Sequence, residues 1–185
     1  MGDSPPIILP KPLVLVGLMG AGKTAVGRRL AAKLEVSFVD ADSEIEAAAG
    51  CTIEEIFESH GEQAFRDGER RVVARLLETE PVHVLATGGG AFMDPETRAL
   101  IKEKAVSVWL RADLEVLFER VSRRSHRPLL KTADPKAKLA ELMALRYPVY
   151  AEADIVVDSG AGPVGAMVER VIEAIKTYFS KEIED

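Results

Sequence analysis

The glycine-rich segment from Gly17 to Thr24 could bind the phosphates of a nucleotide. It reads G-L-M-G-A-G-K-T, fits the pattern G-x-x-x-x-G-K-[ST] and directly follows the apolar run 13–16. Because glycines let the main chain approach closely, backbone N–H groups can surround phosphate oxygens at the positive end of the next helix. Lys23 can then reach the β- and γ-phosphates, and the Thr24 hydroxyl is placed to ligate Mg²⁺. A simple strand-to-helix turn is the alternative, but the flanking elements favour phosphate binding.

Two aspartates lie where a second strand is expected to end. At a site of this kind an aspartate that organises the metal often follows a second core strand. The strand 82–86 is instead followed by Thr87 and three glycines, so this carboxylate has to come from another segment. The strand 37–39 ends in Asp40-Ala41-Asp42, at the sheet edge that also carries the phosphate loop. Since residues two apart on a strand point the same way, we expect Asp40 and Asp42 to face the cleft while Ala41 packs away. Helix capping by Asp42 or Ser43 is the alternative, and it accounts for only one aspartate.

The run Gly88-Gly89-Gly90 and two separate arginines complete the set of candidates. Three glycines weaken a strand or helix, so this run indicates a place where the backbone approaches a ligand closely, although a flexible link is the alternative. Arg66 and Arg146 are unremarkable singly, but together they could supply forked donors for a carboxylate. Glu69, one helical turn after Arg66, could orient the Arg66 guanidinium.

The elements that must position these residues alternate along the chain, which predicts a three-layer α/β/α sandwich with a five-stranded parallel sheet. Ser43 and Asp113 are candidate helix N-caps, and Gly50 is a candidate helix stop. The expected strands are 13–16, 37–39, 82–86, 105–110 and 155–157. The expected helices are 23–34, 43–49, 53–59, 62–78, 95–104, 114–123, 136–151 and 164–179.

The composition of the 185 residues favours a single domain over 13–180, preceded by a disordered arm over 1–12 that holds four prolines. The polar, basic segment 122–135, with Arg123, Arg124 and Arg127, is the expected lid over bound nucleotide. One cysteine, no apolar run of membrane-spanning length and a net charge of −6 indicate a cytoplasmic protein without a nucleic-acid or membrane surface. No heptad repeat or long apolar edge requires a partner, so we expect a monomer.

The chain resembles the shikimate kinase family over about residues 13 to 175. The resemblance rests on the phosphate loop, the strand end 38–42, Gly61-Glu62-Gln63 with Phe65-Arg66, the three glycines, Arg127-Pro128-Leu129-Leu130 and Arg146, in the family's order and spacing. It implies a P-loop NTPase fold like that of the nucleoside monophosphate kinases. It also implies transfer of the γ-phosphoryl group of ATP, with Mg²⁺, to the 3-hydroxyl of shikimate, a step of aromatic amino-acid biosynthesis.

By the same resemblance the candidate residues take roles. Catalysis is assigned to Lys23, Asp40, Asp42 and Arg127, with either aspartate open as the base. ATP binding is assigned to Gly20, Ala21, Gly22, Lys23, Thr24, Ala25, Arg120, Arg127 and Pro163, of which Arg120 and Pro163 would sandwich the adenine. Shikimate binding is assigned to Asp42, Arg66, Gly88, Gly89, Gly90 and Arg146. Mg²⁺ would be held by Thr24 directly and by Asp40 through water.

The chain departs from the family pattern in the loop 159–163, where an arginine near the adenine is often present and this sequence has Ser-Gly-Ala-Gly-Pro. We therefore expect weaker or less selective binding of the adenine base.

Two other functions compete with the main one. A gluconate or nucleoside monophosphate kinase has a similar fold, but the aspartate pair, the Phe-Arg pair and the glycine run favour shikimate. A regulatory module without turnover would be expected to lose some of Lys23, Asp42, Arg66, Arg127 and Arg146, and all five are present.

Overall fold

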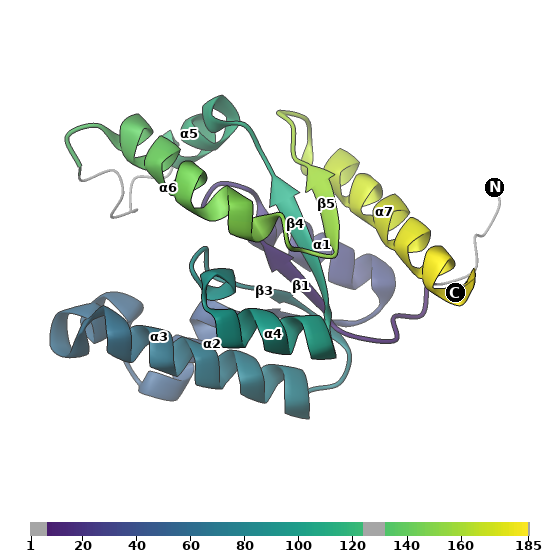
Figure 1. Cartoon of the computed structure of the whole chain (residues 1–185), viewed down its shortest axis with the longest axis horizontal. Helices are drawn as coiled ribbons and strands as arrows, with labels where there is room; N and C mark the ends of the chain where they lie inside the picture. The colour runs from purple at the N-terminus through teal and green to yellow at the C-terminus, as the bar shows by residue number, and fades with distance from the viewer. Residues whose placement is uncertain (1–6, 124–131, 185) are drawn as a thin grey trace.

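The computed structural model describes residues 7–123 and 132–184. Helices and strands alternate along the chain, and the helices flank the sheet (Figure 1). The strands are β1 (Leu13–Val16), β2 (Ser37–Asp40), β3 (His83–Ala86), β4 (Val106–Arg111) and β5 (Ile155–Asp158). The α-helices are α1 (Lys23–Leu34), α2 (Ala41–Ala49), α3 (Ile53–Thr79), α4 (Pro95–Lys104), α5 (Leu114–Ser122), α6 (Pro135–Tyr150) and α7 (Val164–Glu184), and a 3-10 helix, η1, covers Ala91–Met93.

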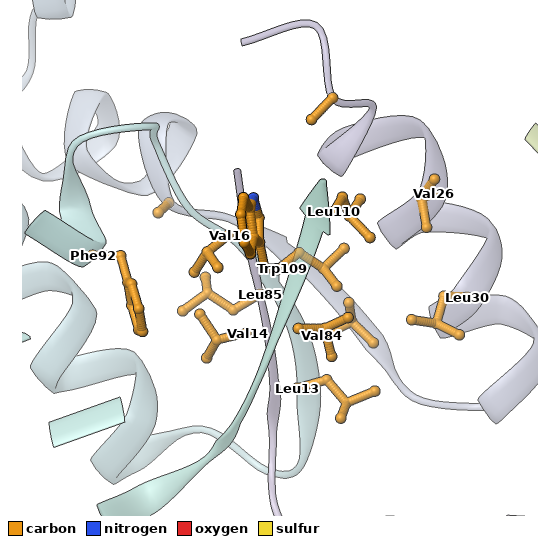
Figure 2. Packing of buried hydrophobic residues seen from close by; sticks show 14 of the residues in the cluster. Leu13, Val14, Val16, Val26, Leu30, Val84, Leu85, Phe92, Trp109 and Leu110 are labelled. Carbon is orange, nitrogen blue, oxygen red and sulfur yellow. The ribbon is translucent and has the colours of Figure 1, made fainter. Parts of the chain in front are cut away.

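The five strands form one parallel sheet in the order β2-β3-β1-β4-β5. The central strand β1 is apolar throughout, and each of its four residues is at most 1% exposed, because helices cover both faces of a parallel sheet. Figure 2 shows Val26 and Leu30 of α1 on one side of the strands and Phe92 on the other. The predicted three-layer α/β/α sandwich is confirmed.

Helix α2 begins two residues earlier than the sequence predicted. Asp40, and not Ser43, is its N-cap, because the Asp40 carboxylate accepts a hydrogen bond from the Ser43 backbone N–H at 3.2 Å. The helix ends as expected at Gly50, which has a φ of 72°. Asp113 does precede α5, but its side chain makes no capping hydrogen bond.

The two helices predicted at 53–59 and 62–78 are joined in α3, with a kink between them. Gly61 adopts φ 84° and ψ 173° there, outside the helical region, and glycine tolerates this conformation best. Thr52 starts α3 with a capping box, in which its hydroxyl accepts from the Glu55 N–H at 3.1 Å and the Glu55 carboxylate accepts from the Thr52 N–H at 2.7 Å. This kinked helix carries Arg66 and Glu69 to the site.

Residues 7–12, the described part of the expected N-terminal arm, are only partly packed against the domain, and Ile8 is 85% exposed. Leu9 is 7% exposed within the core, and the Pro12 carbonyl accepts from the Val106 N–H at 2.9 Å. At the expected lid, residues 124–131, which include Arg124 and Arg127, lie outside the described residues. Within the ranges 7–123 and 132–184, no helix combines the length and apolar character that crossing a membrane requires.

Candidate active site

A pocket of about 560 Å³ opens where β1, β2 and β3 end. It brings together the phosphate loop, both aspartates and part of the glycine run, as expected from the way parallel strands end at one edge of a sheet. Of the predicted site residues, those lining the pocket are Gly20, Ala21, Gly22, Lys23, Thr24, Ala25, Asp40, Asp42, Gly88, Gly89, Arg120 and Arg146. Arg66, Gly90 and Pro163 lie outside this lining, and Arg127 lies outside the described residues.

The phosphate loop has the conformation that its glycines were expected to permit. Gly20 and Gly22 have φ angles of 83° and 93°, which L-residues with side chains rarely adopt. At Gly20 a side chain would also lie 3.1 Å from the Leu117 carbonyl oxygen of α5. The Lys23 ammonium donates to the Gly17 carbonyl at 2.5 Å, so its charge lies over the loop at the start of α1. Backbone N–H groups, helix dipole and ammonium thus favour an anion here.

Thr24 and Asp40 form an oxygen-rich corner beside the loop. The Thr24 hydroxyl lies 3.4 Å from Oδ2 of Asp40, whose Oδ1 caps α2. A hydroxyl and a carboxylate are the hard donors that Mg²⁺ prefers, and Mg²⁺ at nucleotide sites usually takes few protein ligands together with phosphates and waters. In the part of the chain that is described, no cluster of three His, Cys, Asp or Glu side chains could hold a metal by itself. The donor set therefore fits a nucleotide-bound Mg²⁺ better than an all-protein metal site.

Asp42 reaches the pocket by a different route from the one the sequence predicted. It lies in the first turn of α2, so strand alternation does not place it, although Ala41 is buried at 1% exposure as expected. The Asp42 carboxylate faces the glycine run: a Cβ added at Gly88 would lie 3.1 Å from Asp42 Oδ1. The strand end and the first helical turn together bring both aspartates to the pocket.

The glycine run is lined by the protein's own side chains. A Cβ at Gly89 would lie 2.8 Å from Arg146 Nη1, and a Cβ at Gly90 would lie 2.4 Å from Arg66 Nη1. The predicted approach of a ligand to this backbone stays a prediction. In the structure Asp42, Arg146 and Arg66 lie against the run, one beside each successive glycine. This packing places a carboxylate and two guanidinium groups along one strip of backbone beside the phosphate loop.

Arg66 is held by Glu69, as the spacing predicted. The Arg66 guanidinium donates to Glu69 Oε1 at 2.9 Å, and its Nη2 lies 3.6 Å from Glu62 Oε1. Glu69 is only 3% exposed, and this burial raises the pKa of its carboxyl, against the opposing effect of the Arg66 charge. The pair orients the guanidinium toward Gly90.

Arg120 connects the phosphate loop to the loop before α7. Its guanidinium donates to the carbonyl of Gly20 at 3.1 Å, to the Ser159 hydroxyl at 3.1 Å and to the Gly160 carbonyl at 2.6 Å. Burial lowers the pKa of Arg120. The predicted partner across the adenine, Pro163, does not line the pocket, whereas its neighbours Ala161, Gly162 and Val164 do.

Sequence reasoning missed two residues that contact the site: Tyr150, whose hydroxyl donates to the Gly89 carbonyl, and Ser159, which accepts from Arg120. Tyr150 follows Arg146 by four residues on α6, so the two were expected neighbours on one helix face, and that spacing was the available signal. Ser159 gave no local signal, because it joins Arg120 only through the fold. Arg123, named as a lid residue, lines the pocket and donates to Glu119 at 2.5 Å.

Comparison with known proteins gives a consistent family. The model of the family described as "Shikimate kinase" matches residues 19–176. Shikimate kinases of Caulobacter vibrioides and Paramagnetospirillum magneticum are 61% and 59% identical to the chain, covering 90% and 92% of it and 82% and 87% of their own lengths. A gluconokinase structure from Sinorhizobium meliloti, at 19% identity and a TM-score of 0.55, shares the fold alone.

A solved structure extends the likeness from sequence to fold. The shikimate kinase from Acinetobacter baumannii in complex with shikimate superposes with a TM-score of 0.84 at 38% identity, covering 90% of this chain and 93% of its own. The family match spans the phosphate loop from Met19, the aspartates, the glycine run and Arg146. By sequence and by fold, the chain belongs to the shikimate kinase family.

Proposed function

We propose that this pocket transfers the γ-phosphoryl group of ATP to the 3-hydroxyl of shikimate, giving shikimate 3-phosphate and ADP. The observation that carries the proposal is the strip of backbone at Gly88–Gly90, against which Asp42, Arg146 and Arg66 pack beside the phosphate loop. Shikimate has hydroxyls and one carboxylate. Along this strip the Asp42 carboxylate can accept a hydrogen bond from a hydroxyl, and the Arg66 and Arg146 guanidinium groups can bind the carboxylate. The complementarity matches the ligand of the Acinetobacter baumannii relative.

The donor half of the site is built mainly from backbone. The N–H groups at the start of α1 and the Lys23 ammonium surround the β- and γ-phosphates, so that charge spreading over the transferring oxygens meets fixed positive groups. Mg²⁺ held at Thr24 and Asp40 would neutralise phosphate charge when it is bound. Arg120 holds the far side of the loop, and Arg127 is proposed to close on the phosphoryl group.

The acceptor half orients the hydroxyl that attacks. Arg66 and Arg146 bind the carboxylate of shikimate, which fixes the ring, and Asp42 accepts a hydrogen bond from the attacking hydroxyl. As the new P–O bond forms, the bond from the γ-phosphorus to the β,γ-bridging oxygen breaks and the hydroxyl proton passes to Asp42. We favour Asp42 over Asp40 as the base, because Asp40 is engaged by Ser43 and Thr24.

A coupled ADP-release assay tests the proposal, with shikimate, gluconate and nucleoside monophosphates compared side by side at the same ATP and Mg²⁺ concentrations. We expect turnover with shikimate alone, and we expect it to stop when EDTA removes Mg²⁺. Lys23→Met is the matched control, because it removes the phosphate-binding ammonium. Any ADP release that persists in this variant does not come from the pocket. Turnover confined to gluconate or to a nucleotide acceptor would refute the assignment. The monomeric state and the cytoplasmic location remain predictions, which gel filtration and cell fractionation address.

A further inference from the structure

The acceptor wall is the side of the site formed by Gly88–Gly90 with Asp42, Arg66 and Arg146. Tyr150, the last residue of α6, lies against it at Gly89. Its side chain is fully buried, at 0% exposure. Its ring packs among three others, with centroids 5.8 Å from Trp109, 6.1 Å from Tyr147 and 6.5 Å from Phe92. A hydroxyl in such an apolar setting is costly unless it is hydrogen-bonded. The groups around this hydroxyl therefore indicate the role of Tyr150.

The Tyr150 hydroxyl is directed at the site. It donates to the backbone carbonyl of Gly89, and the Arg146 guanidinium lies against the same glycine. Burial raises the pKa of Tyr150 to about 12, against the opposing effect of the Arg146 charge, so the hydroxyl keeps its proton at neutral pH. The Tyr150 hydroxyl is thus a neutral group that bonds to Gly89 beside Arg146.

Arg146, Gly89 and the Tyr150 hydroxyl lie next to one another. A Cβ at Gly89 would lie 2.8 Å from Arg146 Nη1 and 3.6 Å from the Tyr150 hydroxyl oxygen. The three groups therefore meet at one point on the glycine strip. Arg146 is half-buried and has a long side chain, whose ordering costs rotamer entropy. A partner that orders this side chain before the substrate arrives removes that cost from binding.

We propose that Tyr150 is a positioning residue for shikimate: its hydroxyl holds the Arg146 guanidinium against Gly89 in the orientation that receives the substrate carboxylate. This inference rests on the proposed function of the pocket and adds a determinant of affinity that does not itself touch the substrate. Tyr147 provides the contrast on the same helix. Its ring packs edge-on to Trp109 at 4.8 Å, but its hydroxyl donates to the Ala112 carbonyl at 2.5 Å, away from the glycine strip.

The test compares Tyr150→Phe with the matched control Tyr147→Phe, since each removes one hydroxyl from a tyrosine of α6 and keeps the ring. Initial rates are measured with shikimate and ATP varied in turn. We expect Tyr150→Phe to raise the KM for shikimate roughly 5- to 30-fold, about the value of one buried hydrogen bond, with the KM for ATP within about twofold of the parent. Tyr147→Phe should leave both KM values within about twofold.

A second arm separates positioning of Arg146 from general packing. Shikimate methyl ester lacks the carboxylate, so Tyr150→Phe should change its kcat/KM less than about twofold, and the variant should add nothing in an Arg146→Lys background. An unchanged KM for shikimate, or an equal loss with the methyl ester, overturns the inference. If the parent does not phosphorylate shikimate, the proposed function fails instead, so the two failures are distinguishable.

A measurement on the parent protein keeps the inference testable if Tyr150→Phe does not fold. Side-chain ¹⁵N NMR of arginines reports guanidinium mobility, and Arg146→Lys identifies the Arg146 signal. We expect Arg146 to be rigid without substrate, in contrast to Arg123, whose side chain is 75% exposed. An Arg146 signal as mobile as that of Arg123 would refute pre-ordering by Tyr150.

Discussion

Substituting Gly90 by alanine tests the acceptor wall with one added methyl group. The new Cβ would lie 2.4 Å from Nη1 and 2.6 Å from Cζ of Arg66, inside van der Waals contact. Gly90 has φ −93° and ψ −12°, which alanine adopts without strain, so the backbone need not move. The group that must move is the guanidinium, by about 1 Å, because it is the end of a flexible side chain.

The size of the effect follows from what Arg66 is proposed to do. A charged hydrogen bond contributes about 1.5–3 kcal/mol, and misplacement by about 1 Å at a site can cost on the order of a hundredfold. We therefore expect kcat/KM for shikimate to fall roughly 10- to 150-fold, with the KM for ATP nearly unchanged. Replacing glycine also reduces the entropy of the unfolded chain by about 0.4–1 kcal/mol, which offsets the disturbed contact with Glu69. The free energy of unfolding should then change by no more than about 1 kcal/mol.

The assay is coupled ADP release at saturating ATP with shikimate varied, beside urea unfolding of the same preparations. Gly68→Ala is the matched control, because Gly68 lies on α3 and a Cβ there has nothing within 4 Å. It should raise the free energy of unfolding by about 0.5–1 kcal/mol and leave the kinetics alone. If Gly90→Ala keeps kcat/KM for shikimate within twofold of the parent, the placement of Arg66 in the acceptor wall is wrong.

Three further substitutions test other parts of the molecule. Asp42→Asn should keep nucleotide affinity, measured with a fluorescent ATP analogue, but lower kcat at least about 100-fold, and undiminished turnover would remove Asp42 from the site. Arg120→Lys cannot fork to several acceptors, so we expect the KM for ATP to rise several-fold and that for shikimate to hold; a change in shikimate alone contradicts this. Asp94→Ala removes the N-cap of α4 and should cost about 1–2 kcal/mol of unfolding free energy at pH 7, measured in urea. Burial raises the pKa of Asp94, but hydrogen bonds, above all from Arg70, outweigh it and hold it below 3.8; stability from the carboxylate is thus present above pH 3.8 and lost as the pH falls below it. A deficit in Asp94→Ala that stays constant down to pH 2 would contradict this assignment.

The parts of the site that could be predicted from sequence are those determined by local chemistry. The phosphate loop needs positive φ at Gly20 and Gly22, and only a glycine-rich pattern supplies it, so the motif and the conformation correspond closely. The Arg66–Glu69 pair is set by helical spacing, and it forms as predicted. The order of apolar strands and amphipathic helices was enough to predict the parallel sheet.

The parts that sequence did not predict depend on contacts between distant segments. Asp42 was assigned to a strand end, whereas capping by Asp40 starts α2 early and carries Asp42 on a helix. The hydrogen bonds of Arg120 with Ser159 and Gly160 join segments about forty residues apart, which no local pattern encodes. Tyr150 has an ordinary helical environment in sequence, and its role depends on Gly89, 61 residues earlier.

The two halves of the pocket are therefore built in different ways, with a consequence for specificity. Backbone N–H groups and one ammonium form the donor half, so any nucleoside triphosphate presents the same phosphates to it. In the acceptor half, side chains from α2, α3 and α6 each rest on one glycine, and their positions depend on the absence of Cβ atoms. A change at Gly88, Gly89 or Gly90 moves a recognition group without replacing it. Selectivity for the acceptor is thus determined in part by residues whose contribution is the space they leave.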